Sequence, residues 1–177
     1  MEARLEIETG PPVRVVSPDP SWPGLFELER QALAAQLGEL ATGGIHHVGG
    51  TAVAGVDSEP VVDILVGTED LAAARACREA LAALGYVDEP APRQALWLRK
   101  PGLGDRTHHL RLAPAGSRCY RRELAFRDLL RSYRQVAIGY AWMKRDLARR
   151  FRDDRRRYTE TKIEMIASVL AAARLAE

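Results

Sequence analysis

The sequence predicts an α/β protein of the α+β type, with a small mixed β-sheet flanked by helices and a helical last third. Two apolar runs on either side of a glycine-rich loop, within residues 45–67, predict two strands. Two further apolar runs, joined by Pro101-Gly102-Leu103-Gly104, predict a hairpin. After residue 117 the apolar side chains recur at helical spacing only.

Residues 1–12 are interpreted as a flexible acidic tail, and residues 13–177 as a single domain. Val13–Val16 is a candidate short strand. A helix is expected from about Ser21 to Leu40, because its apolar residues are three and four apart and Ser21 suits an N-cap.

A second helix is expected over about 69–84, with Thr68 as its cap and Gly85 at its end. The hairpin strands are expected at 94–100 and 106–112. Three helices are predicted in the last third, at roughly 118–132, 135–151 and 155–173.

Bulk composition bounds the class of protein. A chain of 177 residues with 46% hydrophobic and 28% charged side chains suits one soluble domain. No apolar run reaches the roughly 20 residues of a membrane span, and the acidic start lacks a signal-peptide pattern, so we expect a cytoplasmic protein. Cys77 and Cys119 fit neither a disulfide framework nor a zinc cluster.

Charge is unevenly distributed, although the net charge is only +2. Residues 1–100 carry 8 basic and 15 acidic side chains, whereas residues 117–157 carry 14 basic and 5 acidic ones. Such a basic block can attract phosphate, nucleic acid or an acidic partner. It can equally be the solvated outer face of two helices.

The glycine loop is a candidate phosphate site: Gly49, Gly50 and Thr51. Glycine has no Cβ, so backbone amides can approach a phosphate closely. Strand alternation places Asp63 with Val61 and Leu65 on the face opposite the expected core. Asp63 is then either a metal or cation ligand, or an acid paired to a nearby arginine.

All four histidines fall in two doublets, His46-His47 and His108-His109. If Leu110 and Leu112 mark the core, His109 and Arg111 face a cleft. Alternation does not choose between the members of the first doublet. A histidine in such a place is either a ligand or acid–base group, or a hydrogen-bonded structural residue.

Four cations of the last third are candidate phosphate contacts: Arg127, Arg131, Lys144 and Lys162. Each lysine follows a tyrosine by four residues and shares its helical face, as ordinary snorkelling lysines also do. The two arginines lie one turn apart, where they can clamp an anion or simply pair with Asp128 and Glu123.

At these positions the chain resembles the GrpB family of the nucleotidyltransferase superfamily. The family pattern His-Ile-Gly-Ser-Thr-Ser-Val-Pro-Gly-Leu, followed by Lys-Pro-Ile-Ile-Asp, stands here at 47–56 and 59–63. The family's elements His-His-Leu-His-Val, Phe-Arg-Asp-x-Leu-Arg, Tyr-x-x-Leu-Lys and Tyr-Thr-x-x-Lys have counterparts at 108–112, 126–131, 140–144 and 158–162. The resemblance extends from about Val13 to Leu170.

The resemblance implies a nucleotidyltransferase-like fold, in which a Gly-Gly or Gly-Ser loop binds a nucleoside triphosphate and paired acids hold Mg²⁺. Asp63 is kept as the candidate Mg²⁺ ligand, but Leu65 stands where the second acid belongs. The neighbouring strand offers His109 and Arg111 in place of a third carboxylate. Standard two-metal transfer is therefore not expected.

Three departures from the family pattern are local: Gly50 replaces Ser, Glu59 replaces Lys and Arg111 replaces His. The first removes a hydroxyl from the loop, and the second replaces a cation beside it with an anion. The third removes one candidate metal ligand and adds a permanent donor for phosphate or carboxylate.

Three functions remain open from the sequence. In an enzyme-like nucleotide site, Asp63 holds one Mg²⁺ or orients a cation, His47 and His109 act as acid, base or ligand, and the loop and the cations bind phosphates. The alternative is a non-catalytic module whose basic helices bind an acidic partner or RNA, although an aromatic content of 6% argues against base stacking. A pocket for an acidic metabolite is the third.

Overall fold

The computed structural model describes residues 12–89, 94–100 and 106–173. Its strands form one five-stranded sheet in the order β1-β2-β5-β4-β3. Their bounds are Ile45–Val48 (β1), Val62–Thr68 (β2), Val87–Asp88 (β3), Leu96–Lys100 (β4) and His108–Pro114 (β5). The sheet is mixed, as expected, because β2 and β5 run parallel while the other neighbouring strands pair antiparallel.

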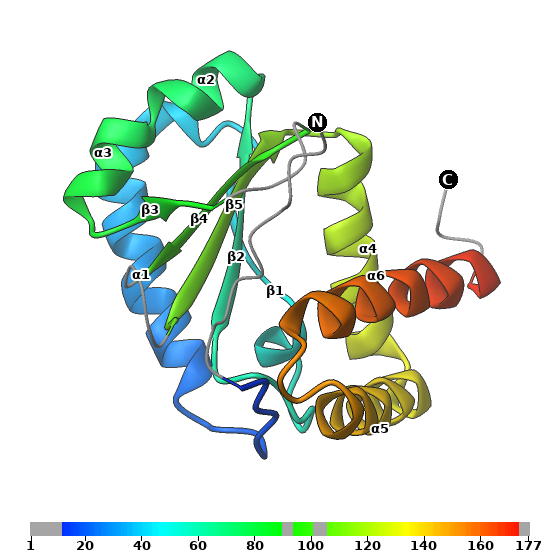
Figure 1. Ribbon diagram of the computed structural model, residues 1–177. Helices are drawn as coiled ribbons and strands as arrows, with labels where there is room; N and C mark the ends of the chain where they lie inside the picture. Colours follow the sequence, from blue (N-terminus) through cyan, green and yellow to red (C-terminus); the bar gives the residue numbers. More distant parts are fainter. Residues whose placement is uncertain (1–11, 90–93, 101–105, 174–177) are drawn as a thin grey trace, which may run out of the picture.

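Helices cover both faces of the sheet, with α1, α2 and α3 on one side and α4, α5 and α6 on the other (Figure 1). Their bounds are Trp22–Leu37 (α1), Leu71–Ala76 (α2), Arg78–Ala83 (α3), Arg118–Ser132 (α4), Arg134–Arg150 (α5) and Arg155–Ala172 (α6). Two 3₁₀ turns, Gly38–Leu40 (η1) and Gly50–Ala52 (η2), complete the described helical elements. Within the described ranges, no helix combines the length and apolarity of a membrane span.

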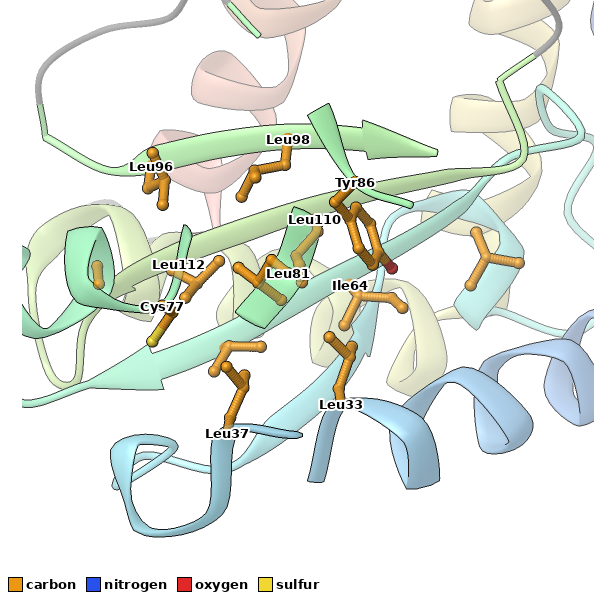
Figure 2. Close-up of a cluster of buried hydrophobic side chains, with 13 residues drawn as sticks. Leu33, Leu37, Ile64, Cys77, Leu81, Tyr86, Leu96, Leu98, Leu110 and Leu112 are labelled. Carbon is orange, nitrogen blue, oxygen red and sulfur yellow. The ribbon is translucent and has the colours of Figure 1, made fainter. Parts of the chain in front are cut away.

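The main core lies between the sheet and the helices α1, α2 and α3. Val62, Ile64 and Val66 of β2 point into it, as the alternation predicts. Leucines from β4 and β5 meet Leu33 and Leu37 of α1 there (Figure 2). This layer holds the strand that carries Asp63 in a fixed orientation.

The opposite face of the sheet is covered too. Leu65 is fully buried, in a small cluster with Val48, Ala113 and Tyr120. Helix α4 packs on this face, and α5 and α6 lie on the same side of the sheet. Leu65, which stands where the second acid belongs, is therefore a packing residue. The helical last third of the chain lies on the side of the sheet that carries Asp63.

Three local expectations were wrong. Val13–Val16 is no strand: Val16 makes a single antiparallel bridge with Ser58. The helix expected over 69–84 is divided into α2 and α3. Its cap is Asp70, whose carboxylate accepts from the Ala73 N–H at 2.7 Å, because Thr68 is still part of β2.

Other boundaries agree closely with the predictions. The three C-terminal helices begin and end within one residue of their expected bounds. β4 and β5 pair antiparallel, as expected of a hairpin, while its turn lies outside the described residues. Ser21 occupies the N-cap position of α1, but its side chain makes no capping hydrogen bond.

Candidate functional site

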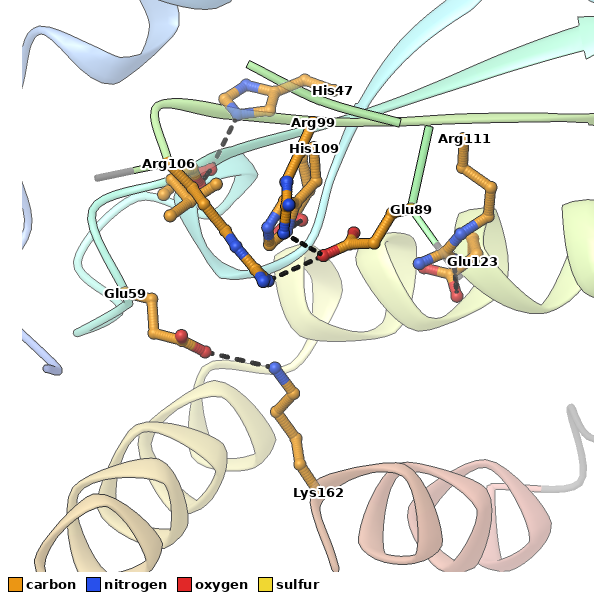
Figure 3. Close-up of polar contacts among 12 residues, drawn as sticks. His47, Glu59, Glu89, Arg99, Arg106, His109, Arg111, Glu123 and Lys162 are labelled. Atoms are coloured by element: carbon orange, nitrogen blue, oxygen red, sulfur yellow. Dashed lines mark hydrogen bonds and ion pairs between the residues drawn. The ribbon is translucent and has the colours of Figure 1, made fainter. Parts of the chain in front are cut away.

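A row of polar side chains lies on the sheet face that α4, α5 and α6 cover, here called the polar face. The strand register places Asp63 of β2 opposite His109 of β5, and His109 opposite Arg99 of β4. Arg111 lies one pleat further along β5, opposite Trp97. Figure 3 shows Arg99, His109 and Arg111 of this row, above Lys162 of α6.

Asp63 and His109 form the centre of this row. Nδ1 of His109 lies 3.1 Å from Oδ1 of Asp63, and both side chains remain about one third exposed, at 27% and 35%. Burial alone raises the pKa of Asp63, but the hydrogen bond from His109 and the charges of Lys162 and Arg111 outweigh it. The pKa of Asp63 therefore lies below its usual value, and the carboxylate is ionised at neutral pH.

One ring nitrogen of His109 takes no part in this pair. Nε2 of His109 is buried and has no hydrogen-bond partner among the described residues. A carboxylate that holds Nδ1 fixes the ring orientation and leaves Nε2 to exchange a proton with a ligand. Asp63 and His109 thus form a hydrogen-bonded pair on the polar face.

Gly49 shows why the loop needs glycine beside this pair. Its φ of 70° and ψ of −168° fall in a backbone region that is nearly exclusive to glycine. A Cβ there would overlap Oδ2 of Asp63 and lie 3.0 Å from its Cγ. The bare backbone at Gly49 lets the carboxylate of Asp63 pack directly against the loop.

Gly50 makes room for a second group, the ammonium of Lys144. Nζ of Lys144 donates to Oγ of Ser58 at 2.8 Å, and a Cβ at Gly50 would overlap both groups. Lys144 is only 3% exposed. Burial lowers its pKa to about 7, and the charge of Lys162 adds to this, against the opposing effect of the acids Glu59, Asp63 and Asp57.

The buried position of the Lys144 ammonium is unfavourable for the stability of the fold. No carboxylate forms an ion pair with it in the described part of the chain. Its ammonium group contacts the Ser58 hydroxyl and the Tyr140 ring, whose centroid lies 4.4 Å from Nζ. A buried charge without a counter-ion destabilises a fold and marks a functional position more often than a structural one. The structure therefore brings a poorly compensated cation to the glycine loop.

The remaining cations of the polar face have carboxylate partners. Arg111 pairs with Glu123 of α4 and stacks on Trp97, with its guanidinium carbon 3.6 Å from the ring centroid. Glu89 bridges two further arginines on this face, Arg99 at 3.6 Å and Arg106 at 2.8 Å. Arg111 is thus oriented toward the polar face.

Glu59 pairs with Arg155 at 2.9 Å and with Lys162 at 3.3 Å. Burial by itself raises the pKa of Glu59, but the two cations prevail and lower it to about 2. This glutamate, which stands where the family pattern has lysine, is the partner that keeps Lys162 in place over the sheet.

Arg127 and Arg131 donate hydrogen bonds to the backbone on either side of the glycine loop. Arg131 donates twice to the carbonyl oxygen of Ala52, at 3.0 and 2.9 Å. Arg127 reaches the carbonyl of His47 at 3.4 Å and pairs with Asp128. Both arginines therefore hold the backbone on either side of the glycines, which confines the loop as a preformed anion site requires.

His47 and Thr51 belong to the other side of the sheet. The register pairs His47 with Ile64, on the main-core face, and its ring stacks on Phe26 at 4.6 Å. Nε2 of His47 lies 3.0 Å from Oγ1 of Thr51, whose hydroxyl also reaches the carbonyl of Val61. The structure does not bring His47 to Asp63, and it engages the Thr51 hydroxyl within the protein.

Burial also sets the charge state of His47. It lowers the pKa of His47 to about 4, with the charges of Arg131 and Arg127 acting in the same direction and that of Asp63 opposing them. The unfolded chain binds a proton near the ordinary value of 6.5, and the folded chain does not. Stability is therefore fully present above 6.5 and falls as the pH drops toward 4.

We expect this histidine to cost up to about 3 kcal/mol of stability across that window. The measurement is urea unfolding of wild type and His47→Gln at about pH 7 and about pH 5. The wild type should lose more stability on acidification than the variant does. Equal losses would show that His47 is protonated in the folded protein as readily as in the unfolded one.

Several members of the site could not be anticipated. Ser58, Glu89, Glu123 and Arg155 become site residues only through contacts with distant segments. Trp97 and Arg99 had a signal, since they alternate with the buried Leu96 and Leu98 of β4. The same alternation identified His109 and Arg111 on β5.

The side chains around Asp63 decide whether this site fits a metal ion. The described residues include no cluster of three or more His, Cys, Asp or Glu side chains that could hold a metal ion. Oδ1 of Asp63 is engaged by His109, and the charges of Arg111 and Lys162 act on the same carboxylate. These residues do not fit a divalent cation held between paired carboxylates.

Comparisons with known proteins agree with this architecture. A family model described as "GrpB protein" matches residues 12–172. The UPF0157 protein PA4798 of Pseudomonas aeruginosa is 36% identical over 166 residues, which cover 91% of this chain and 67% of that protein.

Two solved structures are also similar. Conserved protein GrpB from Enterococcus faecalis has a TM-score of 0.78 and 28% identity, over 90% of this chain and 99% of that one. Cid1, solved with its short product ApU, has a TM-score of 0.50 and 15% identity, over 73% of this chain and 40% of that one. At that identity the second likeness concerns the fold alone.

Proposed function

This chain belongs to the GrpB family and has a nucleotidyltransferase-like fold, and we propose that it binds a nucleotide or another phosphorylated or acidic ligand on the polar face. One observation carries the proposal. Lys144 is buried against the glycine loop, and no carboxylate of the described residues forms an ion pair with it. An anion at the loop supplies the missing counter-charge.

The surroundings favour the same ligand class. Arg111 lies on the polar face and Lys162 lies over it, while the Asp63 carboxylate and the Lys144 ammonium pack directly against Gly49 and Gly50. The couple of Asp63 and His109 stands beside these groups and gives the site one acid–base centre. In this arrangement the cations bind and orient the ligand, and Nε2 of His109 exchanges a proton with it.

The proposed ligand site does not include Mg²⁺. Asp63 is the candidate metal ligand of the sequence analysis, and its donor set is unfavourable as described above. We therefore expect ligand binding without a divalent cation. No step of the proposed binding is assigned to a metal.

Thermal unfolding tests the proposal, with a panel of nucleoside mono-, di- and triphosphates and small dicarboxylic acids, each with and without Mg²⁺ or Mn²⁺. A ligand of the native state at a hundred times its Kd adds about 2.7 kcal/mol, which raises the Tm of a domain of this size by about 5 °C or more. We expect such a shift for wild type, without a need for metal.

Two variants make the screen specific. Lys144→Met should lose the shift, and Arg134→Met, which removes an exposed cation of the same helix, should keep it. Absence of a shift with every anion would contradict the proposal. A shift that requires Mg²⁺ and disappears in Asp63→Asn would instead place a metal at Asp63.

A further inference from the structure

The buried ammonium of Lys144 has a consequence beyond ligand contact. Its nearest polar neighbour is the Ser58 hydroxyl, which itself lies 3.2 Å from the carbonyl of Val56. Neither group carries a negative charge. The free protein therefore holds the Lys144 side chain in a place where its charged form is poorly stabilised.

The charged groups that face Lys144 are engaged elsewhere. On the segment that follows the glycine loop, Asp57 pairs with Arg145 and Glu59 with Lys162 and Arg155. On β2, Asp63 is held by His109. From α6, Lys162 adds a like charge. None of these groups neutralises Lys144 directly, and Lys162 works against its protonation.

We propose that Lys144 is a proton-coupled anion receptor, so that an anion captured at the glycine loop binds together with a proton taken up by this amine. The inference rests on the proposed function and deepens it. An anion beside Gly50 supplies the counter-charge that the fold omits, so the ammonium form becomes the stable one. Ligand affinity is then higher at lower pH.

The sign of the linkage follows from the free protein. Burial lowers the pKa of Lys144 to about 7, from 10.5, so about half of the molecules carry the charge at neutral pH. An anion raises the pKa again. Affinity therefore falls as the pH rises above about 7, approaching tenfold per pH unit for one proton.

The composition of the chain allows a direct measurement, because Lys100, Lys144 and Lys162 are its three lysines. Protein labelled with ¹³C-lysine gives three Cε signals in a heteronuclear NMR spectrum, and Lys144→Met identifies the one that belongs to Lys144. The probe is sulfate, which keeps its charge throughout the pH range. Titrations are recorded with and without it.

The expected result is a Lys144 signal with a midpoint near neutral pH, which sulfate moves upward by about one unit or more, a tenfold coupling. The Lys162 signal in the same spectra is the comparison, because Lys162 already has Glu59 as a partner. Arg134→Met should behave as wild type.

Two outcomes overturn the inference while the proposed function stands. In one, sulfate stabilises the protein but the Lys144 midpoint does not move. In the other, Lys144 titrates only at the usual high pH in the free protein. If no anion of the thermal panel binds, the proposed function fails and this inference fails with it. The midpoints themselves are read on wild type, and the variant serves only to assign the Lys144 signal.

Discussion

Gly49→Ala should lose about 3 kcal/mol of stability or more, together with ligand binding. The backbone at Gly49 lies in a region that costs other residues about 1–3 kcal/mol. The added methyl group would also overlap Oδ2 of Asp63 and force this carboxylate away from His109. Strain and displacement act on the same few atoms, so the hydrogen bond between Asp63 and His109 is lost together with the stability.

Urea unfolding measures the loss, and Gly55→Ala is the matched control. Gly55 also has a positive φ, 76°, but a Cβ there would meet nothing within 4 Å. It reports the backbone strain alone, about 1 kcal/mol. The difference between the two variants contains the cost of displacing Asp63 and any additional backbone strain at Gly49. If both lost the same amount, the contact between Gly49 and Asp63 would not be a structural constraint.

Lys144→Met should have the opposite effect on stability. Methionine fills a similar volume without a charge, so the variant should gain about 1–4 kcal/mol near neutral pH while it loses the anion. A buried charge that serves ligand binding typically lowers the stability of the fold, so its removal raises stability and abolishes binding. Lys162→Met is the contrasting variant: it removes one partner from the buried carboxylate of Glu59 and should therefore destabilise the fold.

The pH dependence gives this prediction a second signature. The folded protein holds Lys144 with a pKa of about 7, whereas the unfolded chain has 10.5. Between these values the unfolded state binds more protons, so the stability of wild type rises with pH relative to the variant. The advantage of Lys144→Met should shrink through this window, by up to about 4–5 kcal/mol.

Chemical denaturation of both proteins at about pH 7 and about pH 10 measures this change. A constant difference between the two proteins would mean that Lys144 titrates alike in the folded and unfolded states. The structural reason for an unfavourable lysine at the glycine loop would then be absent.

The residues that the sequence placed well are those with local signals. Helix bounds in the last third followed from apolar periodicity, and His109 and Arg111 followed from alternation with Leu110 and Leu112. Alternation also placed Leu65 correctly on the face opposite the main core, but it did not show that α4 covers that face.

The pairing of charges lay beyond local reasoning. Arg127 and Arg131 were candidate phosphate clamps, and the structure shows them donating to the carbonyls of His47 and Ala52, about 80 residues earlier in the chain. Alternation could not assign His47 to a face, because its strand is short and each face has one apolar residue, Ile45 beside His47 and Val48 beside His46. The register with β2 assigned it.

By itself, the sequence determined the family, the mixed sheet with its helical last third, and the glycine loop beside Asp63, because these features reside in short segments. The tertiary structure alone decided which charges are compensated. Lys144 meets Ser58 across 86 residues and Glu59 meets Lys162 across 103. Burial and ion pairing depend on what the fold brings together, so only the folded chain distinguishes a lysine with a partner from a lysine that lacks one.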